Sequence, residues 1–464
     1  MKVKMNETRQ PFFFINTEFL MITSPSRTLH WFRNDLRLDD NPALACALQN
    51  EEVVLVVVLD EHFWDQDRWG HIKTGSFRTR FLLESIDDLK NSIAQLGGSL
   101  LVKQGRPQKI LPSLMQTWSC NTLTAQAEHT PEEIDIQESV ESAVCQVGGV
   151  CSWIEGQTLF HPEDIPMKLE SLPDTFTQFR KKIEKLSVVR DCISAPKTLC
   201  CPKDLISDDV PVLGEFLATF GLTSPTLDSR SVLPFKGGAS EARLRLKYYF
   251  WEAKRLAVYK KTRNGLLGAD YSSKFSPWLA HGCISPRRIA SEVYRFERKY
   301  EANKSTYWFV FELMWRDYFR FIAMKYGVRI FHRKALKPES ASREIRSSAF
   351  ISWKNGQTKD NFVNANMREL ARTGYMSNRG RQNVASYLVH DLGIDWRLGA
   401  SWFEHMLLDY DPASNTGNWI YIAGVGNDPR PNRKFNTQLQ ANMYDGKGKY
   451  QTLWSTDALE LDVR

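Results

Sequence analysis

The sequence predicts a protein in which an α/β domain with a parallel sheet is followed by an all-helical domain. Short apolar runs rich in β-branched residues alternate with helical patterns early in the chain, and strand patterns stop after residue 237. A chain of 464 residues is also longer than one hydrophobic core usually serves. We therefore place the α/β domain at 28–155, a connector at 156–236 and the helical domain at 237–454.

Five apolar runs are the expected strands of the sheet. They are Thr28–Phe32, Val53–Leu59, Ser99–Lys103, Thr122–Ala125 and Val150–Ile154. The helical patterns between them are Asn41–Leu48, Ser76–Leu96, Pro107–Thr117 and Pro131–Val147. Each is long enough for a crossover connection, so parallel strands with helices on both faces are expected. No Gly-x-Gly-x-x-Gly opens the first helix, which argues against a dinucleotide clamp there.

The connector is expected to run over the surface, because its periodicity is weak and prolines recur in it. Helical patterns then dominate the rest of the chain. They cover Arg243–Tyr259, Pro286–Lys299, Thr306–Tyr326, Asn361–Thr373, Arg379–Leu392 and Ala400–Leu408. Residues 1–27 are interpreted as a disordered tail or a mistaken start with Met21 as the true initiator, and 455–464 as a short tail.

The composition is that of a soluble globular protein, with 42% hydrophobic and 25% charged residues. No apolar run is long enough to cross a membrane. The eight cysteines form no Cys-x-x-Cys pair, so no metal site is expected, and reduced thiols in the cytoplasm are the simplest interpretation. An organellar address stays open. The net charge of +7 is compatible with a nucleic-acid partner, although many basic proteins bind none.

Polar residues gather around Ser276-Pro277, where a serine N-cap followed by proline is typical of a helix start. Two further serines and Lys274 precede it, and such a cluster would suit an anion. An ordinary capped helix is the alternative.

A strongly aromatic helix carries Glu312 and Arg316 four residues apart on one face, beside Trp315. Charges in such a setting must pair or contact a ligand. The two residues therefore form either a buried ion pair or part of a site for a planar ligand.

Two more polar stretches begin helices farther along the chain. Met376–Asn383 combines amide and guanidinium groups that would suit a phosphate, and an exposed helix end is the alternative. Leu408–Trp419 carries two aspartates, an asparagine and a tryptophan. A turn and a helix cap explain such a stretch more often than the alternative, a metal site, for which no histidine or third carboxylate clusters with the two aspartates. The 14 tryptophans are core anchors by default.

Taken together, these stretches resemble the photolyase and cryptochrome superfamily, and the DASH branch in particular. The similarity runs from Trp31–Arg37 and Asp40–Leu44 to the neighbourhood of Trp454, leaving out the connector and the first 27 residues. The segments that resemble the DASH branch are Thr262–Gly265, Ser272–Gly282, Asn378–Val384 and Gly426–Arg430.

The resemblance implies an FAD in the helical domain, folded into a U shape. The cofactor-binding residues that it implies are Tyr259, Ser272, Ser273, Lys274, Phe275, Ser276, Arg316, Asn378, Arg381, Asp409, Asp411 and Asn415. The pyrophosphate is expected near Ser272–Ser276, and the Asn415 amide against the N5 edge of the flavin, where it tunes the cofactor without supplying a strong acid.

By the same resemblance, Trp419 and Trp396 are the inner members of a tryptophan chain that reduces the photoexcited flavin. The outermost member is missing from its expected neighbourhood, and either Trp353 or a tyrosine replaces it, or photoreduction is impaired. Trp315, Glu312, Arg379, Gln382 and Tyr421 fall on lesion-pocket positions. Catalytic roles are expected for Trp419, Trp396, Asn415 and Glu312.

Gln382 and Tyr421 stand where duplex-repairing photolyases carry Met and Trp, so the pocket is expected to be more polar. The expected activity is therefore repair of cyclobutane pyrimidine dimers in single-stranded DNA by electron transfer from reduced FAD. A 5,10-methenyltetrahydrofolate antenna is expected in the α/β domain near Glu128 and Glu132, and the protein is expected to be a monomer. The alternatives are a DNA-binding blue-light photoreceptor or transcriptional regulator without repair activity, and a flavin oxidoreductase, for which no nicotinamide site is visible.

Overall fold

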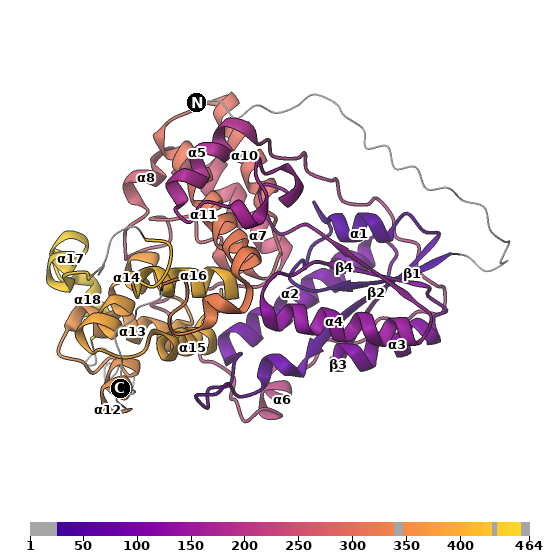
Figure 1. Cartoon of the computed structure of the whole chain (residues 1–464), viewed down its shortest axis with the longest axis horizontal. Helices are drawn as coiled ribbons and strands as arrows, with labels where there is room; N and C mark the ends of the chain where they lie inside the picture. Colours follow the sequence, from indigo (N-terminus) through magenta and orange to yellow (C-terminus); the bar gives the residue numbers. More distant parts are fainter. Residues whose placement is uncertain (1–25, 338–346, 429–433, 456–464) are drawn as a thin grey trace.

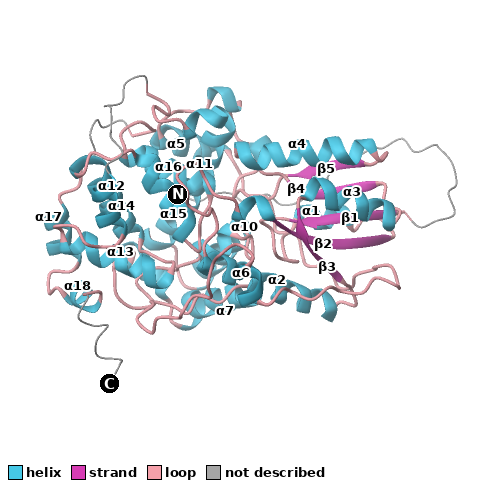
Figure 2. Ribbon diagram, turned by 90° about the horizontal axis from the view of Figure 1, so that it is seen from below, coloured by secondary structure: helices cyan, strands magenta, loops and turns pink. Residues whose placement is uncertain are grey.

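The computed structural model describes residues 26–337, 347–428 and 434–455. Its α/β part contains one sheet of five parallel strands in the order β3-β2-β1-β4-β5. The strands are β1 (Arg27–Phe32), β2 (Glu52–Asp60), β3 (Leu100–Gly105), β4 (Thr122–Gln126) and β5 (Val150–Ile154), and the helices between them are α1 (Pro42–Ala47), α2 (Ser76–Gln95), α3 (Pro107–Thr117) and α4 (Pro131–Gln146). Figure 2 shows this sheet at one end of the molecule and the helical part at the other. The predicted fold class is confirmed.

The sheet is buried on both faces, which explains why the β2 run is apolar throughout. Val53, Leu55 and Val57 belong to the large buried cluster that continues into the helical domain. The alternate residues Val54 and Val56 belong to a second cluster, on the opposite face, that includes side chains of α3 and α4. Successive side chains of a strand point to opposite faces, so one face of the sheet shares its core with the helical domain.

The helical domain is built around the 23-residue helix α11 (Lys304–Tyr326), which Asn303 and Thr306 cap with a reciprocal capping box. The other helices are α7 (Ala239–Leu246), α8 (Tyr259–Thr262), α9 (Ser276–Ala280), α10 (Pro286–Lys299), α12 (Ser347–Lys354), α13 (Asn361–Thr373), α14 (Asn378–Ser386), α15 (Trp396–Met406), α16 (Pro412–Ile422), α17 (Thr437–Tyr444) and α18 (Lys449–Leu453). Helix α16 contacts α11, α14 and α15, and the four lie together in Figure 1.

The largest departures from the predicted organisation are one helix and the connector. The single helix expected over Arg243–Tyr259 is wrong: α7 passes into a π-helical turn, and Lys254 then takes a left-handed backbone conformation with φ +50°. The stretch 156–236 is not a surface connector throughout. It contains α5 (Phe176–Leu186) and α6 (Leu213–Ala218), and its Leu159 and Phe160 are buried.

Several expectations lie outside the described residues. They are the tail or mistaken start, except for its last two positions, the short C-terminal tail beyond residue 455, and the end of the Gly426–Arg430 motif after residue 428. Among the residues that the structure describes, no helix combines the length and apolar character that a membrane crossing needs.

Candidate functional site

A cavity of about 310 Å³ lies among the helices of the second domain. Its walls come from α8, α9, α11, α14, α15 and α16, together with the loop that precedes α9. All twelve predicted cofactor-binding residues line it: Tyr259, Ser272, Ser273, Lys274, Phe275, Ser276, Arg316, Asn378, Arg381, Asp409, Asp411 and Asn415. Segments more than 150 residues apart in sequence thus converge on one space, whose volume is within the range of small-molecule sites.

Lys274 is a buried lysine whose Nζ has no hydrogen-bond partner among the residues that the structure describes. Its side chain is 3% exposed and lines the cavity, and its Nζ lies 3.2 Å from the centroid of the Tyr271 ring. Burial lowers the pKa of Lys274 to about 6, because an ammonium without water or a carboxylate is unstable. A bound anion would supply the missing partner, so this wall of the cavity fits a phosphate group.

Ser276 is not the helix N-cap that the sequence predicts. Helix α9 starts at Ser276 itself, Phe275 occupies the capping position, and no side chain caps the helix. The prediction failed because the chain turns one residue earlier, where Lys274 has φ +59°.

Glu312 and Arg316 both line the cavity, but they do not pair with each other. The Arg263 guanidinium donates to the Glu312 carboxylate. Arg316 donates to the carbonyl oxygens of Gln157 at 2.6 Å and Leu279 at 3.2 Å. The ion-pair alternative for these two residues is therefore wrong, and their polar groups stand beside each other at the cavity wall with separate partners.

The two aspartates of the 408–419 stretch are each held by an arginine. Arg381 donates to both carboxylate oxygens of Asp409, at 2.9 and 2.8 Å. Asp411 accepts from Arg320 and caps α16 by accepting from the Ser414 N–H at 2.7 Å. Burial opposes the ionisation of Asp411, but the nearby arginines hold its pKa below the usual value. The two carboxylates are therefore held in place by arginines in the wall of the cavity.

Four of the other predicted site residues lie away from this cavity. Trp315 stacks on Phe176 with ring centroids 3.8 Å apart and meets Tyr421 edge-on at 5.9 Å. Arg379 donates to Gln382 at 3.0 Å and to Asn264 at 3.1 Å. The set that does not line the cavity is Trp315, Tyr421, Arg379 and Trp396, whereas Glu312, Gln382 and Trp419 do line it.

Trp419 connects the cavity with other aromatic rings. Its centroid lies 5.1 Å from Phe403 and 6.5 Å from Trp353. Trp353 is completely buried, and its indole N–H donates to the Val384 carbonyl at 3.0 Å. A fully buried ring cannot exchange electrons directly with an external donor, so Trp353 does not suit the outermost position of a relay. Trp396 lies elsewhere, on the wall of a second cavity.

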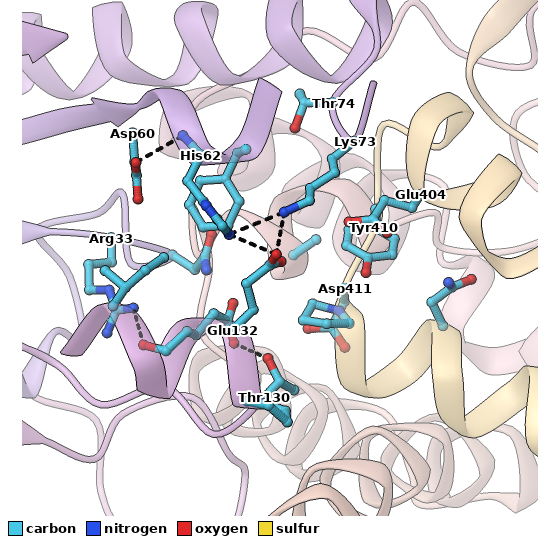
Figure 3. A pocket seen from close by; sticks show the side chains of 18 of the residues that line it. Arg33, Asp60, His62, Lys73, Thr74, Thr130, Glu132, Glu404, Tyr410 and Asp411 are labelled. Atoms are coloured by element: carbon cyan, nitrogen blue, oxygen red, sulfur yellow. Dashed lines mark hydrogen bonds and ion pairs between the residues drawn. The ribbon is translucent and has the colours of Figure 1, made fainter. Parts of the chain in front are cut away.

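That second cavity, of about 920 Å³, lies between the two domains at the carboxyl ends of β1 and β2. In the sheet order the chain changes direction between β1 and β4, and ligands of open parallel sheets bind at such a switch point. Figure 3 shows His62 and Lys73 reaching the Glu132 carboxylate, with Tyr410 and Asp411 opposite, on the helical side. The His62 Nε2 to Glu132 Oε1 distance is 2.7 Å.

Of the two glutamates expected near an antenna, Glu132 lines this cavity and Glu128 does not. Glu128 is buried behind the wall, where Gln157 and Asn34 donate to it. Burial raises the pKa of Glu133 to about 8 and that of Glu404 to about 7, so the cavity contains carboxyl groups that titrate near neutral pH.

Sequence reasoning missed the other polar residues of the interdomain cavity, such as His62, Lys73, Arg78, Glu404 and Tyr410. The sequence offers one indication of them: His62 directly follows β2, and ligands bind at the carboxyl ends of parallel strands. In the smaller cavity it missed Arg263, Phe309 and Tyr375. The two cavities share a wall, which includes Leu279, Ala280, Arg316, Tyr410, Asp411 and Asn415.

Comparisons with known proteins agree with this architecture. Residues 28–198 match the family model of DNA photolyase, and residues 309–462 match that of the FAD binding domain of DNA photolyase. Cryptochrome DASH of Xenopus laevis is 46% identical over 436 residues, covering 93% of this chain and 83% of the relative. The chloroplastic/mitochondrial cryptochrome DASH of Oryza sativa is 44% identical over 469 residues, covering 94% and 79%.

Solved structures show the same relationship. The crystal structure of a Synechocystis cryptochrome superposes with a TM-score of 0.89 and 44% identity, covering 95% of this chain and 91% of that one. A class III photolyase from Agrobacterium tumefaciens gives a TM-score of 0.79 and 26% identity, covering 94% and 88%. The chain therefore belongs to the cryptochrome DASH family, and it is a blue-light flavoprotein with the photolyase fold and an FAD-binding domain.

Proposed function

We propose that FAD occupies the 310 Å³ cavity and that the protein repairs cyclobutane pyrimidine dimers in single-stranded DNA under blue light. The observation that carries this proposal is the convergence of the twelve predicted residues on one cavity with an unpartnered buried ammonium, Lys274, in its wall. The ammonium calls for an anion, and the pyrophosphate of FAD is one.

Each wall of the cavity has a separate task in this proposal. Lys274 and the serines before and after it hold the pyrophosphate, and the Arg381–Asp409 pair fixes the opposite wall. Asn415 donates to the Ala400 carbonyl at 3.2 Å, which orients its amide oxygen. Reduced FAD would supply the photoexcited electron that splits the dimer and would take that electron back afterwards.

The preference for single strands rests on the polar groups around Gln382. Arg379 joins Gln382 to Asn264 and, at 3.3 Å, to Gln440 of α17. This group of polar side chains offers hydrogen bonds but little surface on which a base can stack. Each base–aromatic contact is worth about 1–3 kcal/mol, so the pocket gains little of that energy. Extracting a dimer from a duplex costs about a few kcal/mol, which a single-stranded substrate avoids.

The interdomain cavity is proposed to hold the antenna, 5,10-methenyltetrahydrofolate. Its position at the switch point of the sheet and the wall that it shares with the smaller cavity support this assignment. Glu132, with His62 and Lys73, presents acceptors and donors suited to the edge of a heteroaromatic ring. A second absorption band that disappears in Glu132→Ala, while the flavin band stays, would support it. Loss of both bands would contradict it.

The test of the proposed function is repair by the photoreduced full-length protein. Oligothymidylate carrying one cyclobutane dimer would be illuminated as a single strand and as a duplex, and the restored thymines would be quantified by chromatography. We expect repair of the single strand, slower repair of the duplex and none in the dark. A flavin-loaded protein that binds the oligonucleotide but leaves the dimer intact would contradict repair and favour the photoreceptor alternative.

A further inference from the structure

The buried position of Lys274 favours the neutral amine, which flavin binding alone does not explain. It is a non-glycine residue with φ +59°, in the left-handed region, and its ammonium nitrogen is buried without a hydrogen-bond partner. Its nearest aromatic neighbour is Tyr271, at 3.2 Å from Nζ to the ring centroid. The hydroxyl of Tyr271 is buried as well, beside Tyr375.

The charged groups around Lys274 do not supply a counter-ion at contact distance. On α7, Arg245 donates to the carbonyls of Ser272 and Ser273 and is bridged to Asp270 at 3.3 Å. On α14, Arg381 is committed to Asp409. On α13, Glu369 is 1% exposed and one of its oxygens accepts from Tyr450 at 2.6 Å.

These surroundings lower the pKa of Lys274 and raise the pKa of Glu369. Burial and then Arg245 lower the pKa of Lys274 to about 6. Burial raises the pKa of Glu369 to about 7, although Tyr450 and Lys274 favour its ionised form. Burial without a counter-ion at contact distance therefore favours the uncharged amine of Lys274 at the place where the proposed function puts an anion.

We propose that the cavity takes up FAD together with one proton, which Lys274 Nζ carries against the pyrophosphate. The step is a proton transfer: the bond between the proton and hydronium or a buffer acid breaks, the lone pair of Lys274 Nζ forms the new N–H bond, and no group changes its oxidation state. The inference rests on the proposed occupancy of the cavity by FAD, and it adds that the occupied and the empty sites differ in protonation.

The proposal has a quantitative consequence through linkage. Below about pH 6 the amine is already protonated and binding takes up no proton. Above that pH the dissociation constant of FAD should rise by up to about tenfold per pH unit, until the higher pKa of Lys274 in the occupied site is reached. The pyrophosphate diester of FAD does not titrate in this range, so the slope reports the protein.

The experiment is a titration of the flavin-free full chain with FAD between about pH 6 and about pH 9, followed by flavin fluorescence. Calorimetry at about pH 7.5 in buffers of different ionisation enthalpy counts the protons taken up. We expect close to one proton and a rising dissociation constant. Tight binding with no pH dependence and no proton uptake would overturn the inference and leave the proposed function intact, whereas failure to bind FAD would overturn both.

Three variants separate a protonation role from a structural one. Lys274→Arg keeps the cation at every pH, so its dissociation constant should not change with pH. Lys274→Met should bind FAD weakly and without a slope, and a wild-type slope in this variant would overturn the inference. Lys261→Met removes an exposed lysine of α8 and should behave like the wild type.

Thermal unfolding of flavin-free Lys274→Met checks that the fold is intact. The folded-state pKa of Lys274 is lowered from 10.5 to about 6. At a pH between these two values, the unfolded chain binds one proton more than the folded chain. Lys274 therefore lowers the free energy of unfolding as the pH falls, and the whole loss is reached below about pH 6. Methionine has no charge to desolvate, so the variant should melt above the wild type at about pH 6, by a margin that shrinks as the pH rises. A variant that melts well below the wild type at that pH would contradict the burial cost.

Discussion

At the scale of single residues, the tryptophans around the cavity are all buried, and they differ in whether they line a cavity. Trp396 lines the interdomain cavity, which exposed Gln66 and Arg68 also line. Trp353 lies 6.5 Å from Trp419 between ring centroids, but it lines neither cavity. The indole N–H groups of Trp353 and Trp396 both donate to carbonyls, so the difference between the two is the cavity. Without a cavity beside it, an oxidised Trp353 should be a dead end for charge.

This division predicts how substitutions change photoreduction of the bound flavin by an external thiol. Trp419→Phe and Trp396→Phe should each remove most of the blue-light bleaching of the flavin band, because each interrupts the path to solvent. Trp353→Phe should bleach at nearly the wild-type rate under the same illumination. If Trp353→Phe abolished bleaching and Trp396→Phe did not, the relay would run through the buried ring instead.

For single residues, the sequence predicted which side chains line the cavity better than it predicted which side chains form ion pairs with each other. The twelve expected cofactor residues line one space because motifs carry residue type and order, which fix their place in a family fold. The partner of Glu312 is Arg263, 49 residues away, and the partner of Asp411 is Arg320. Such long-range pairs depend on how helices pack, which local spacing does not contain.

At the scale of elements, strands were predicted to within one or two residues, since most residues of β1, β2 and β4 are buried and the β2 run is almost entirely apolar. Helices at the cavity were predicted less well. The helix expected over Ala400–Leu408 begins at Trp396 in the structure, where Asp395 caps it by accepting from the Arg397 N–H at 3.0 Å. The break after α7 comes from a left-handed residue that is not glycine, Lys254, so no residue type announces it.

Helix α15 approaches α16 so closely that one position accepts no side chain. A Cβ on Gly399 would lie 2.3 Å from the Trp419 ring and 2.4 Å from Leu388. Alanine normally stabilises a helix by about 1 kcal/mol relative to glycine. Gly399→Ala should nevertheless lower the free energy of unfolding by about 1–3 kcal/mol, because the methyl group displaces the tryptophan that lines the cavity.

The matched control is Gly214→Ala in α6, where a Cβ would meet only the Ser224 hydroxyl at 3.6 Å. That variant should be neutral or more stable by about 1 kcal/mol or less. Urea unfolding of both variants gives the comparison, and flavin content should fall only in Gly399→Ala. Equal stability of the two variants would mean that α15 shifts at little cost.

At the scale of the whole molecule, the two domains are joined by a buried polar contact as well as by the shared core. Asp40, completely buried in the α/β domain, accepts from Arg287 at 2.7 Å and from Ser285. Arg37 donates to the Gly282 carbonyl at 2.9 Å. These bonds lie at and just beyond the C-terminal end of the 272–282 segment that supplies the cavity loop, so the α/β domain helps to hold the cavity of the helical domain.

Asp40→Asn keeps the size of the side chain and its tolerance of the left-handed backbone that residue 40 adopts, with φ +51°, but removes the charge. Arg287 would then be buried without its anion, a loss that costs about 3–5 kcal/mol when a buried pair is broken from one side. The neighbouring pair Asp39–Arg288 offers the control, since its side chains are 28% and 30% exposed. Asp39→Asn should cost only about 0–1 kcal/mol.

Urea unfolding measures the stability of both variants, and release of FAD is the second readout. Flavin should leave at a lower urea concentration in Asp40→Asn than in Asp39→Asn, because the interface that supports the cavity loop has lost its anion. Equal flavin retention in the two variants would show that the helical domain holds its cavity without the α/β domain.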